Sequence, residues 1–261
     1  MILTLDIGNS NIKVAVFENE KLKHYWRTST NCQYTCDEYG MTFINFFNNA
    51  NIKISDIDGI MLSSVVPTIN YTIEHMCSLY FKINPIWVVP GMKTGINIRY
   101  DVPQQLGSDR IANAVAAYHL YGKPTIFIDF GTATTFGAID KSGAFIGGCI
   151  CPGIKVASDA LVSGTAKLSR FEFTKPSSVI CRNTTSNLQS GVIYGYIGQV
   201  SYLIDRFKNE MNAPEAFVVA TGGMAKLIAE DVKSINMIDG LLTLKGLRIL
   251  YEKNSWYIRL N

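Results

Sequence analysis

The sequence predicts an α/β protein built by duplication, with two lobes of similar construction. One short motif occurs twice, as Leu3–Asn11 and again as Ile126–Thr134. In each copy an apolar strand ends in Asp-x-Gly, passes through small polar or hydroxyl residues and resumes as a strand. The copies stand nearly half the 261-residue chain apart. We therefore expect an N-terminal lobe over residues 1–121, a C-terminal lobe over 122–261, and one ligand that faces both loops.

Composition indicates a folded protein that binds neither nucleic acid nor membrane. Hydrophobic residues make up 48% of the chain and charged residues 17%, which suits a protein with a proper core. The net charge of +3 is spread along the chain, without the basic run expected of a nucleic-acid binder. No apolar stretch approaches the ~18 residues of a membrane span. The N-terminus enters a strand at once and carries no signal-peptide pattern, so we expect a cytoplasmic protein.

The six cysteines do not form a metal-binding pattern. No Cys-x-x-Cys pair occurs, and the three histidines stand apart from the cysteines, which excludes a structural zinc site. Reduced thiols in a cytosolic protein are the simplest account. We expect Cys149 and Cys151 to point to opposite faces of a strand.

In the first half, strand and helix patterns alternate. Apolar residues at helical spacing from Met41 to Phe47 predict a helix over 37–48. Residues 90–106 are irregular and polar, with Gly91, Gly95 and Pro103, and predict a loop of functional length. Ser108 is expected as the N-cap of a helix that ends at Gly122. The remaining elements predicted are two strands within 1–17, strands over 22–27, 59–66 and 85–89, and a helix over 70–81.

The second half repeats this order. We expect strands over 125–129 and 135–140 around the second loop, then a strand that reaches Gly147-Gly148. Asn183-Thr184-Thr185 is typical of a helix start, ahead of a long helix with Gly191 and Gly195 on one face. The other elements predicted are helices over 153–166, 190–212 and 224–230 and a buried strand over 217–223.

The residue types of the repeated loop suit a phosphate-bearing ligand. Glycine allows close approach of the backbone. Successive amide groups in such a turn can donate to phosphate oxygens, as can the side chains of Asn9, Ser10, Asn11, Thr132, Thr134 and Thr135. A carboxylate beside this cradle would repel a bare phosphate, so Asp6 and Asp129 imply a cation between them and the ligand. One copy alone is typical of an ordinary hairpin turn. The presence of a second copy favours a nucleotide site.

Two further glycine elements stand where a strand meets a helix. Thr221-Gly222-Gly223 suggests a site for the nucleoside end of a nucleotide, although a Gly-Gly pair often just turns the chain. Gly147-Gly148 with Pro152-Gly153 is equally compatible with a ligand site and with a tight turn before a proline-started helix.

Asp109 is the candidate catalytic carboxylate. In the first turn of a helix an aspartate often serves only to stabilise the helix dipole, but Asp109 follows a long loop and has arginines nearby. Arg110 is its neighbour and Arg99-Tyr100 lies just upstream. An acidic group flanked by arginines suits a substrate with both a hydroxyl and a carboxylate. Arginine can donate two parallel hydrogen bonds to the carboxylate, and aspartate can accept a hydrogen bond from the hydroxyl.

Taken together, these motifs resemble the type III pantothenate kinases, members of the actin-like superfamily of acetate and sugar kinases, whose lobes are ribonuclease H-like and enclose a nucleotide cleft. Each motif alone is modest, but their ordered set is specific and runs from residue 1 to about residue 248. Ser10 stands where threonine is common, and Cys149 to Cys151 fill variable positions. The matching segments are Asp6–Lys13, Gly91–Gly95, Arg99–Asp101, Gly107–Arg110, Asp129–Thr135, Gly147–Gly153, Asn183-Thr184 and Thr221–Gly223.

The resemblance implies ATP-dependent phosphorylation of pantothenate, the first step of coenzyme A biosynthesis. Asp109 would be the base, and Asp6 would face Mg²⁺. Asp129 would hold a monovalent cation, K⁺ or NH₄⁺. The implied ATP contacts are Asp6, Ile7, Gly8, Asn9, Ser10, Asn11, Ile12, Lys13 and Thr132, and Gly222 and Gly223 are added by the glycine argument above. The implied pantothenate contacts are Tyr100, Gly107, Ser108, Asp109, Arg110 and Thr184.

The resemblance further implies a homodimer in which the partner subunit helps to close the substrate pocket, and insensitivity to feedback by coenzyme A. Two alternatives remain. One is a kinase of the same superfamily with another small hydroxylated substrate, which would not require the Gly107–Arg110 segment. The other is a non-catalytic regulator that keeps the fold. Such a protein is expected to have lost residues of its phosphate-binding loops. In this sequence Asp6, Asp109 and Asp129 are all present.

Overall fold

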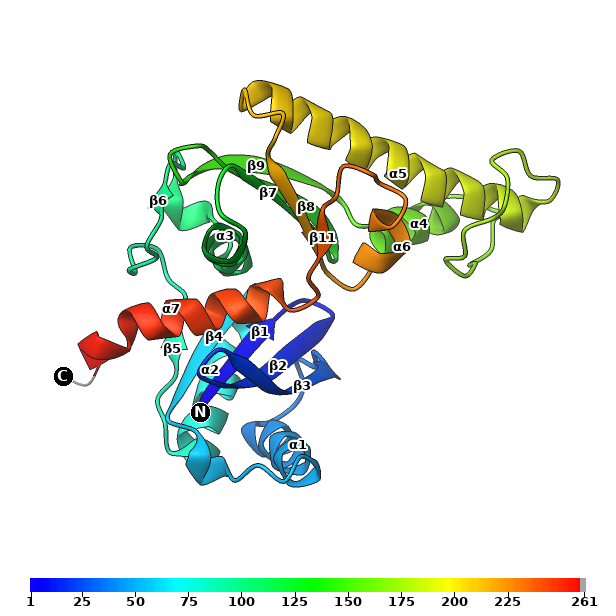
Figure 1. The fold of residues 1–261 in the computed structure, drawn as a ribbon. Helices are drawn as coiled ribbons and strands as arrows, with labels where there is room; N and C mark the ends of the chain where they lie inside the picture. Colours follow the sequence, from blue (N-terminus) through cyan, green and yellow to red (C-terminus); the bar gives the residue numbers. More distant parts are fainter. Residues whose placement is uncertain (259–261) are drawn as a thin grey trace. The chain divides into compact units, whose positions relative to one another are not determined.

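The computed structural model describes residues 1–258, with side chains described through residue 255, and it divides into two compact units. The first unit contains Met1–Ala116 and the segment from Leu241 onward, and the second is Ala117–Gly240. Each unit is built on one β-sheet with helices against it (Figure 1). In the part of the chain that the structure describes, no helix is long and apolar enough to cross a membrane.

The sheet of the first unit has the strand order β3-β2-β1-β4-β5. Helices α1 and α2 cover one face of it, where their aromatic and aliphatic side chains join a core with Leu3, Leu5 and Leu62. Its strands are β1 (Ile2–Ile7), β2 (Asn11–Glu18), β3 (Lys21–Ser29), β4 (Gly59–Ser64) and β5 (Ile86–Trp87). Its other elements are α1 (Cys36–Asn49), α2 (Asn70–Met76), which continues as a π-helical turn over Cys77–Phe81, the short strand β6 (Asn97–Ile98) and the start of α3 (Ser108–Tyr121).

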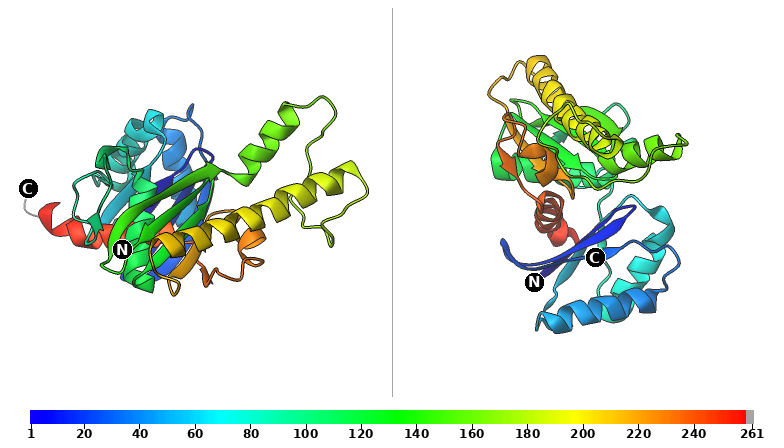
Figure 2. Two further views of the ribbon diagram at one scale, coloured as in Figure 1. Left: turned by 90° about the horizontal axis from the view of Figure 1, so that it is seen from above. Right: turned by 90° about the vertical axis from the view of Figure 1, so that its right-hand side faces the viewer.

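Helix α7 (Leu242–Ile258) covers the opposite face of this sheet. Figure 2 shows α7 on one side of the sheet and α1 on the other. The α7 helix also crosses α3 closely, because a Cβ on Gly246 would lie 2.0 Å from the Ala112 carbonyl oxygen. Beside this crossing the Thr243 hydroxyl donates to the Asn113 side-chain oxygen over 2.8 Å, and both residues are buried.

The sheet of the second unit runs β11-β10-β7-β8-β9. Helices α4, α5 and α6 contribute to the apolar cluster on one face, with Ile126, Ile128 and Phe130 of β7. The α4 helix and the first half of α5 extend beyond the edge of the sheet (Figure 2). The elements are β7 (Thr125–Phe130), β8 (Ala133–Ile139), β9 (Ala144–Pro152), α4 (Ile154–Ser163), α5 (Thr184–Glu210), β10 (Phe217–Thr221), α6 (Ala225–Ala229) and β11 (Met237–Ile238).

The end of α3 is fixed within the second unit. The Tyr121 hydroxyl donates to the Asp239 carboxylate over 2.8 Å, and the Tyr121 ring stacks on Phe217. Burial, and then the bond to Asp239, raises the pKa of Tyr121 above its usual value, so this phenol stays a donor.

The two sheets repeat one topology, which confirms the predicted duplication. In the first unit β1 pairs antiparallel with β2 and parallel with β4. In the second unit β7 pairs antiparallel with β8 and parallel with β10. The motif-bearing strand is therefore central in each sheet, and the loop after its aspartate is the turn of its hairpin.

The structure differs from the expected lobes at the end of the chain. We expected residues 122–261 to form the C-terminal lobe, but α7 belongs to the first unit and the boundary along α3 falls after Ala116. The physical reason is that the buried side chains of α7, among them Leu244, Leu247 and Leu250, cover the sheet of the first unit. No element was predicted over α7 or over β11.

Two local expectations were wrong, and one helix begins before its predicted range. Cys149 and Cys151 pack against the same apolar cluster, because residues two apart on a strand share a face. The helix predicted over 190–212 begins at Thr184, which confirms the helix start expected at Asn183-Thr184-Thr185, and Asn183 is its N-cap, accepting from the Ser186 N–H. Ser108 is the first residue of α3, and its hydroxyl bonds to strand β4 rather than serving as the predicted N-cap. The six cysteines, all within the described residues, form no disulfide.

Candidate active site

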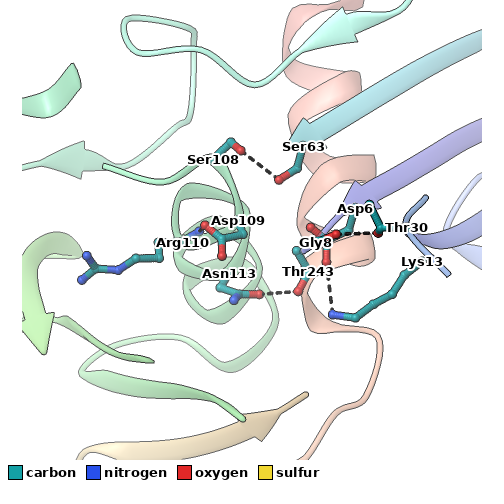
Figure 3. A network of polar contacts seen from close by, with 10 residues as sticks. All are labelled: Asp6, Gly8, Lys13, Thr30, Ser63, Ser108, Asp109, Arg110, Asn113 and Thr243. Carbon is teal, nitrogen blue, oxygen red and sulfur yellow. Dashed lines mark hydrogen bonds and ion pairs between the residues drawn. The ribbon is translucent and has the colours of Figure 1, made fainter. Parts of the chain in front are cut away.

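In the first unit a row of three polar side chains crosses the sheet where β1 ends. Asp6 on β1 lies opposite Lys13 on β2 and opposite Ser63 on β4, so all three share one face. The Lys13 ammonium donates to the Asp6 carboxylate over 3.1 Å, and the Asp6 side chain is only 10% exposed (Figure 3). The pair is therefore partly shielded from water, and the lysine offsets the charge of the carboxylate.

The loop after Asp6 is held by Thr30, the residue that follows strand β3. The Gly8 N–H donates to the Asn11 carbonyl, and the Thr30 hydroxyl donates to the Gly8 carbonyl over 2.6 Å (Figure 3). Asn9 and Ser10 lie exposed at the tip of the hairpin. The loop therefore exposes its polar tip while hydrogen bonds fix its base.

Asp109 is held in the first turn of α3 by its immediate neighbours. Its carboxylate accepts a hydrogen bond of 2.8 Å from the Arg110 backbone N–H. A Cβ on Gly107 would lie 2.5 Å from the Asp109 carboxylate oxygen, so the carboxylate folds back over a position that only glycine leaves open. The predicted Gly-x-Asp-Arg segment thus orients one carboxylate.

Arg110 and Tyr100 form a second part of this region. The Arg110 guanidinium lies over the Tyr100 ring at 5.8 Å from the ring centre, and its Nη1 lies 3.5 Å from the Tyr100 hydroxyl. The Arg110 residue is 5% exposed. Arginine suits such a buried position because its planar guanidinium can stack on an aromatic ring.

A pocket of about 260 Å³ lies in the loop that precedes α3. Its wall includes Leu106 and Ile111, which bracket the Gly107–Arg110 segment in the chain. The Asn254 side chain of α7 fixes the loop, because it accepts from the Lys93 N–H and donates to the Lys93 carbonyl. The other lining residues are Val89, Pro90, Gly91, Met92, Thr94, Ile96, Asn97, Ile98 and Pro103. Most of these lining residues are apolar, and such a pocket suits the hydrocarbon part of a small molecule.

In the second unit the equivalent row contains hydroxyls instead of a lysine. Asp129 on β7 lies opposite Thr135 on β8 and opposite Thr221 on β10. The Thr221 hydroxyl is buried and has no hydrogen-bond partner among the described residues. Asp129 itself is 9% exposed. The second loop therefore places a nearly buried carboxylate beside a buried, unsatisfied hydroxyl.

Both remaining glycine elements pack against this second loop. Gly222, at φ +97°, lies so close to β7 that a Cβ would stand 2.5 Å from the Asp129 carboxylate oxygen. The Gly153 N–H donates to the Thr132 carbonyl over 3.1 Å, and a Cβ on Gly153 would stand 2.2 Å from that oxygen. Gly153 and Gly222 thus pack against the second loop, and Gly222 shapes the surroundings of Asp129.

The donors present fit the expected cations differently. Carboxylate and hydroxyl oxygens are ligands for a hard cation, and the buried Thr221 hydroxyl beside Asp129 lacks the partner that such an ion would supply. Near Asp6 the fit is to Mg²⁺ held chiefly by a nucleotide, because Mg²⁺ commonly takes one or two carboxylates together with phosphates and water. Among the described residues no group of three or more His, Cys, Asp and Glu side chains could hold a metal ion.

Other predicted residues take less central places. Thr184 is exposed at the start of α5, and Gly223 is exposed before the short α6. Sequence reasoning missed Thr30, Ser63 and Asn254, which act through partners far away in the chain. For Ser63 the sequence did offer a signal, the pair Ser63-Ser64 at the end of a buried strand. That pair belongs to no functional motif.

Several solved structures are similar to this protein in fold. A candidate Baf family transcriptional activator from Campylobacter jejuni is 21% identical, with 97% of this chain and 98% of that chain covered and a TM-score of 0.62. A candidate 2-dehydro-3-deoxygalactonokinase from Sinorhizobium meliloti is 8% identical, with 97% and 96% covered and a TM-score of 0.58. The ethanolamine utilization protein EutJ from Carboxydothermus hydrogenoformans is 10% identical, with 95% and 89% covered and a TM-score of 0.55.

These likenesses show the fold, which is that of the actin-like ATPases and sugar kinases. The family follows from the sequence itself, because residues 2–206 match the model of the type III pantothenate kinases. That match contains both aspartate loops, the Gly107–Arg110 segment and the start of α5. The chain belongs to the type III pantothenate kinase family.

Proposed function

We propose that this protein transfers the γ-phosphoryl group of ATP to the hydroxyl of pantothenate, giving 4′-phosphopantothenate. Membership of the family supports the general activity, that of a kinase that uses ATP to phosphorylate a small molecule. The finer part rests on one observation, the Gly107–Arg110 segment, in which the Asp109 carboxylate is held by the Arg110 backbone N–H and Arg110 supplies a buried guanidinium stacked on Tyr100. Pantothenate has both a hydroxyl and a carboxylate, which are the groups that these two side chains suit.

Asp109 is the proposed base. Its carboxylate is fixed by the Arg110 N–H and can accept a hydrogen bond from the substrate hydroxyl, which orients the oxygen for attack. The transition state of phosphoryl transfer is loose, so the hydroxyl proton becomes acidic late and the base needs no strongly shifted pKa. The pocket in the loop before α3 is the proposed place for the hydrocarbon part of the substrate.

The two aspartate loops are proposed to act on the nucleotide. The tip of the first loop, with Asn9 and Ser10, donates to phosphate oxygens, and Asp6 and Lys13 lie at its base. A magnesium ion facing Asp6 would offset the charge of the phosphates when it is bound. Asp129 with the Thr221 hydroxyl is the proposed site of a monovalent cation, K⁺ or NH₄⁺.

The second unit offers a surface for a homodimer. Along α5, Gly191, Gly195 and Gly198 leave open space where their Cβ atoms would stand. Exposed apolar side chains occur in the same unit, including Ile150 at 64% and Ile180 at 87% exposure. Such surfaces are typical of protein interfaces, and we propose a cytoplasmic homodimer whose partner subunit helps to close the substrate pocket. Sedimentation velocity measures the oligomeric state.

The decisive experiment is phosphate transfer from ATP to pantothenate by the purified protein with Mg²⁺, with and without K⁺. We expect 4′-phosphopantothenate, formed faster with K⁺. The Asp109→Asn variant should lower kcat about a thousandfold, by loss of the base, and should keep the wild-type melting temperature. A kcat near that of the wild type would show that Asp109 is not the base.

Two alternatives predict other outcomes. A kinase of the same superfamily with another small hydroxylated substrate would bind ATP but form no 4′-phosphopantothenate. A non-catalytic regulator would neither bind ATP nor form product. This alternative is motivated by the similar structure from Campylobacter jejuni, which is described as a transcriptional activator. The complete first loop and the ordered Asp109 favour the kinase.

A further inference from the structure

The Ser108 side chain is turned toward strand β4 and away from any ligand. Its hydroxyl lies 3.0 Å from the Ser63 hydroxyl, 3.1 Å from the Ser64 N–H and 3.0 Å from the Ser64 carbonyl (Figure 3). The family resemblance implied instead that Ser108 contacts the substrate. The observed contacts give this residue a different task.

The direction of these bonds follows from the hydroxyl's one hydrogen. Ser108 donates that hydrogen to the Ser64 carbonyl and accepts from the Ser64 N–H. The Ser63 hydroxyl therefore has to donate to Ser108. One donor and two acceptor positions are then in use, which is the full capacity of a serine hydroxyl.

Ser63 connects this cluster to the first aspartate loop. It is fully buried and lies opposite Asp6 in the parallel pairing of β1 and β4. Ser108 is the first residue of α3, and the next residue is Asp109. A row of contacts thus runs from the strand that carries Asp6, through Ser63 and Ser108, to the turn that carries Asp109 (Figure 3).

We propose that Ser63 and Ser108 are positioning residues that fix the first turn of α3 on the end of β4 and so aim the Asp109 carboxylate. The inference rests on the proposed function, because it concerns the base of that reaction. A strand end in the middle of a sheet is a rigid support, and catalysis is sensitive to small displacements of a reacting group.

The test separates positioning from substrate binding. Ser108→Ala should lower kcat about tenfold to a hundredfold, as a small misplacement of a base does, and should leave the KM for pantothenate within about twofold. Ser63→Ala should give a smaller loss, and the double variant should match Ser108→Ala, because both remove parts of one cluster. Ser108→Thr keeps the hydroxyl and should restore most of kcat.

Ser190→Ala is the matched control, since it also removes a buried serine hydrogen bond, to the Val179 carbonyl in the second unit. It should leave kcat unchanged. A Ser108→Ala variant with a raised KM and an unchanged kcat would show that Ser108 binds substrate, and the inference would be wrong.

Hydrogen–deuterium exchange on the protein alone decides the inference without any substrate. Amides over 107–112 should exchange at least about fivefold faster in Ser108→Ala than in the wild type, since the cluster no longer holds the turn. They should be unchanged in Ser190→Ala. Unchanged exchange in Ser108→Ala overturns the inference, whereas failure of the wild type to phosphorylate pantothenate overturns only the proposed function.

Discussion

The two aspartate loops share a backbone and differ in the side chain that faces the carboxylate. Lys13 stands opposite Asp6, whereas Thr135 holds the same register position opposite Asp129. The parallel neighbours, Ser63 and Thr221, are hydroxyl residues in both units. One duplicated hairpin thus provides a carboxylate offset by a lysine in the first unit and a carboxylate among hydroxyls in the second.

This difference suggests two electrostatic tasks. A lysine beside a carboxylate leaves little net charge, so the first loop can lie near a highly charged phosphate chain. A carboxylate among hydroxyls keeps its charge and offers only oxygen ligands, which suits a bare cation. The duplication therefore conserves geometry while the facing residue sets the chemistry.

The largest expected effect comes from removing each carboxylate in turn. Asp6→Asn should lower kcat about a thousandfold at any K⁺ concentration, because a metal-bound nucleotide loses several kcal/mol of charge stabilisation. Asp129→Asn should lower kcat about tenfold to a hundredfold and abolish the K⁺ dependence. Steady-state kinetics over a K⁺ titration measures both. If instead Asp6→Asn lost the K⁺ dependence, Asp6 would be the residue at the monovalent cation and Asp129 the residue that faces Mg²⁺.

Glycine substitutions sharpen the comparison through stability. Gly222→Ala places a methyl group 2.5 Å from the Asp129 carboxylate at a φ of +97°, and should cost about 2–4 kcal/mol. Gly8→Ala meets only the Asn11 carbonyl at 3.2 Å, and should cost about 1 kcal/mol or less. Urea denaturation gives both free energies of unfolding. Equal losses would mean that Gly222 is not confined by Asp129.

Exchanging the facing residues has an intermediate effect. Lys13→Gln removes the cation beside Asp6 and should lower kcat/KM for ATP about tenfold, as loss of a charged hydrogen bond does. The matched change in the second unit, Thr135→Val, should alter kcat/KM for ATP less than about twofold. Initial rates over an ATP series measure both. Equal losses would remove the proposed electrostatic distinction between the loops.

The smallest effect concerns the buried Thr221 hydroxyl. Thr221→Val keeps the shape of the side chain and removes an unsatisfied hydroxyl, so the free energy of unfolding should change by about 0.5 kcal/mol or less. If this hydroxyl is a cation ligand, half-activation by K⁺ should need about fivefold more K⁺, which corresponds to the loss of about 1 kcal/mol. An unchanged K⁺ requirement would remove Thr221 from the cation site.

The sequence was sufficient for features that depend on local pattern. The hairpins around Asp6 and Asp129 follow from apolar alternation and small turn residues, and the Gly-x-Asp-Arg segment follows from its position after a long loop. These features depend on neighbours in the chain, so the residues themselves carry the signal. The duplicated motif then predicted the duplicated topology.

Features that depend on distant pairing were not predictable in this way. Ser63 and Thr221 reach the aspartates only through the parallel pairing of separate strands. Asn254 reaches Lys93 across most of the chain. The apolar spacing of Leu244, Leu247 and Leu250 is compatible with a helix, but nothing in it says which sheet the helix covers, and the duplication suggested the other one.

The return of α7 to the first unit has a consequence for how the chain folds during synthesis. Residues 117–240 form a continuous unit that leaves the ribosome complete. The first unit begins earlier but lacks the helix that covers one face of its sheet until residues 242–258 emerge. The apolar face of its sheet stays exposed while the second unit is synthesised. The first unit therefore completes its fold after the second unit. Ribosome stalling anywhere before α7 would leave that face available to chaperones.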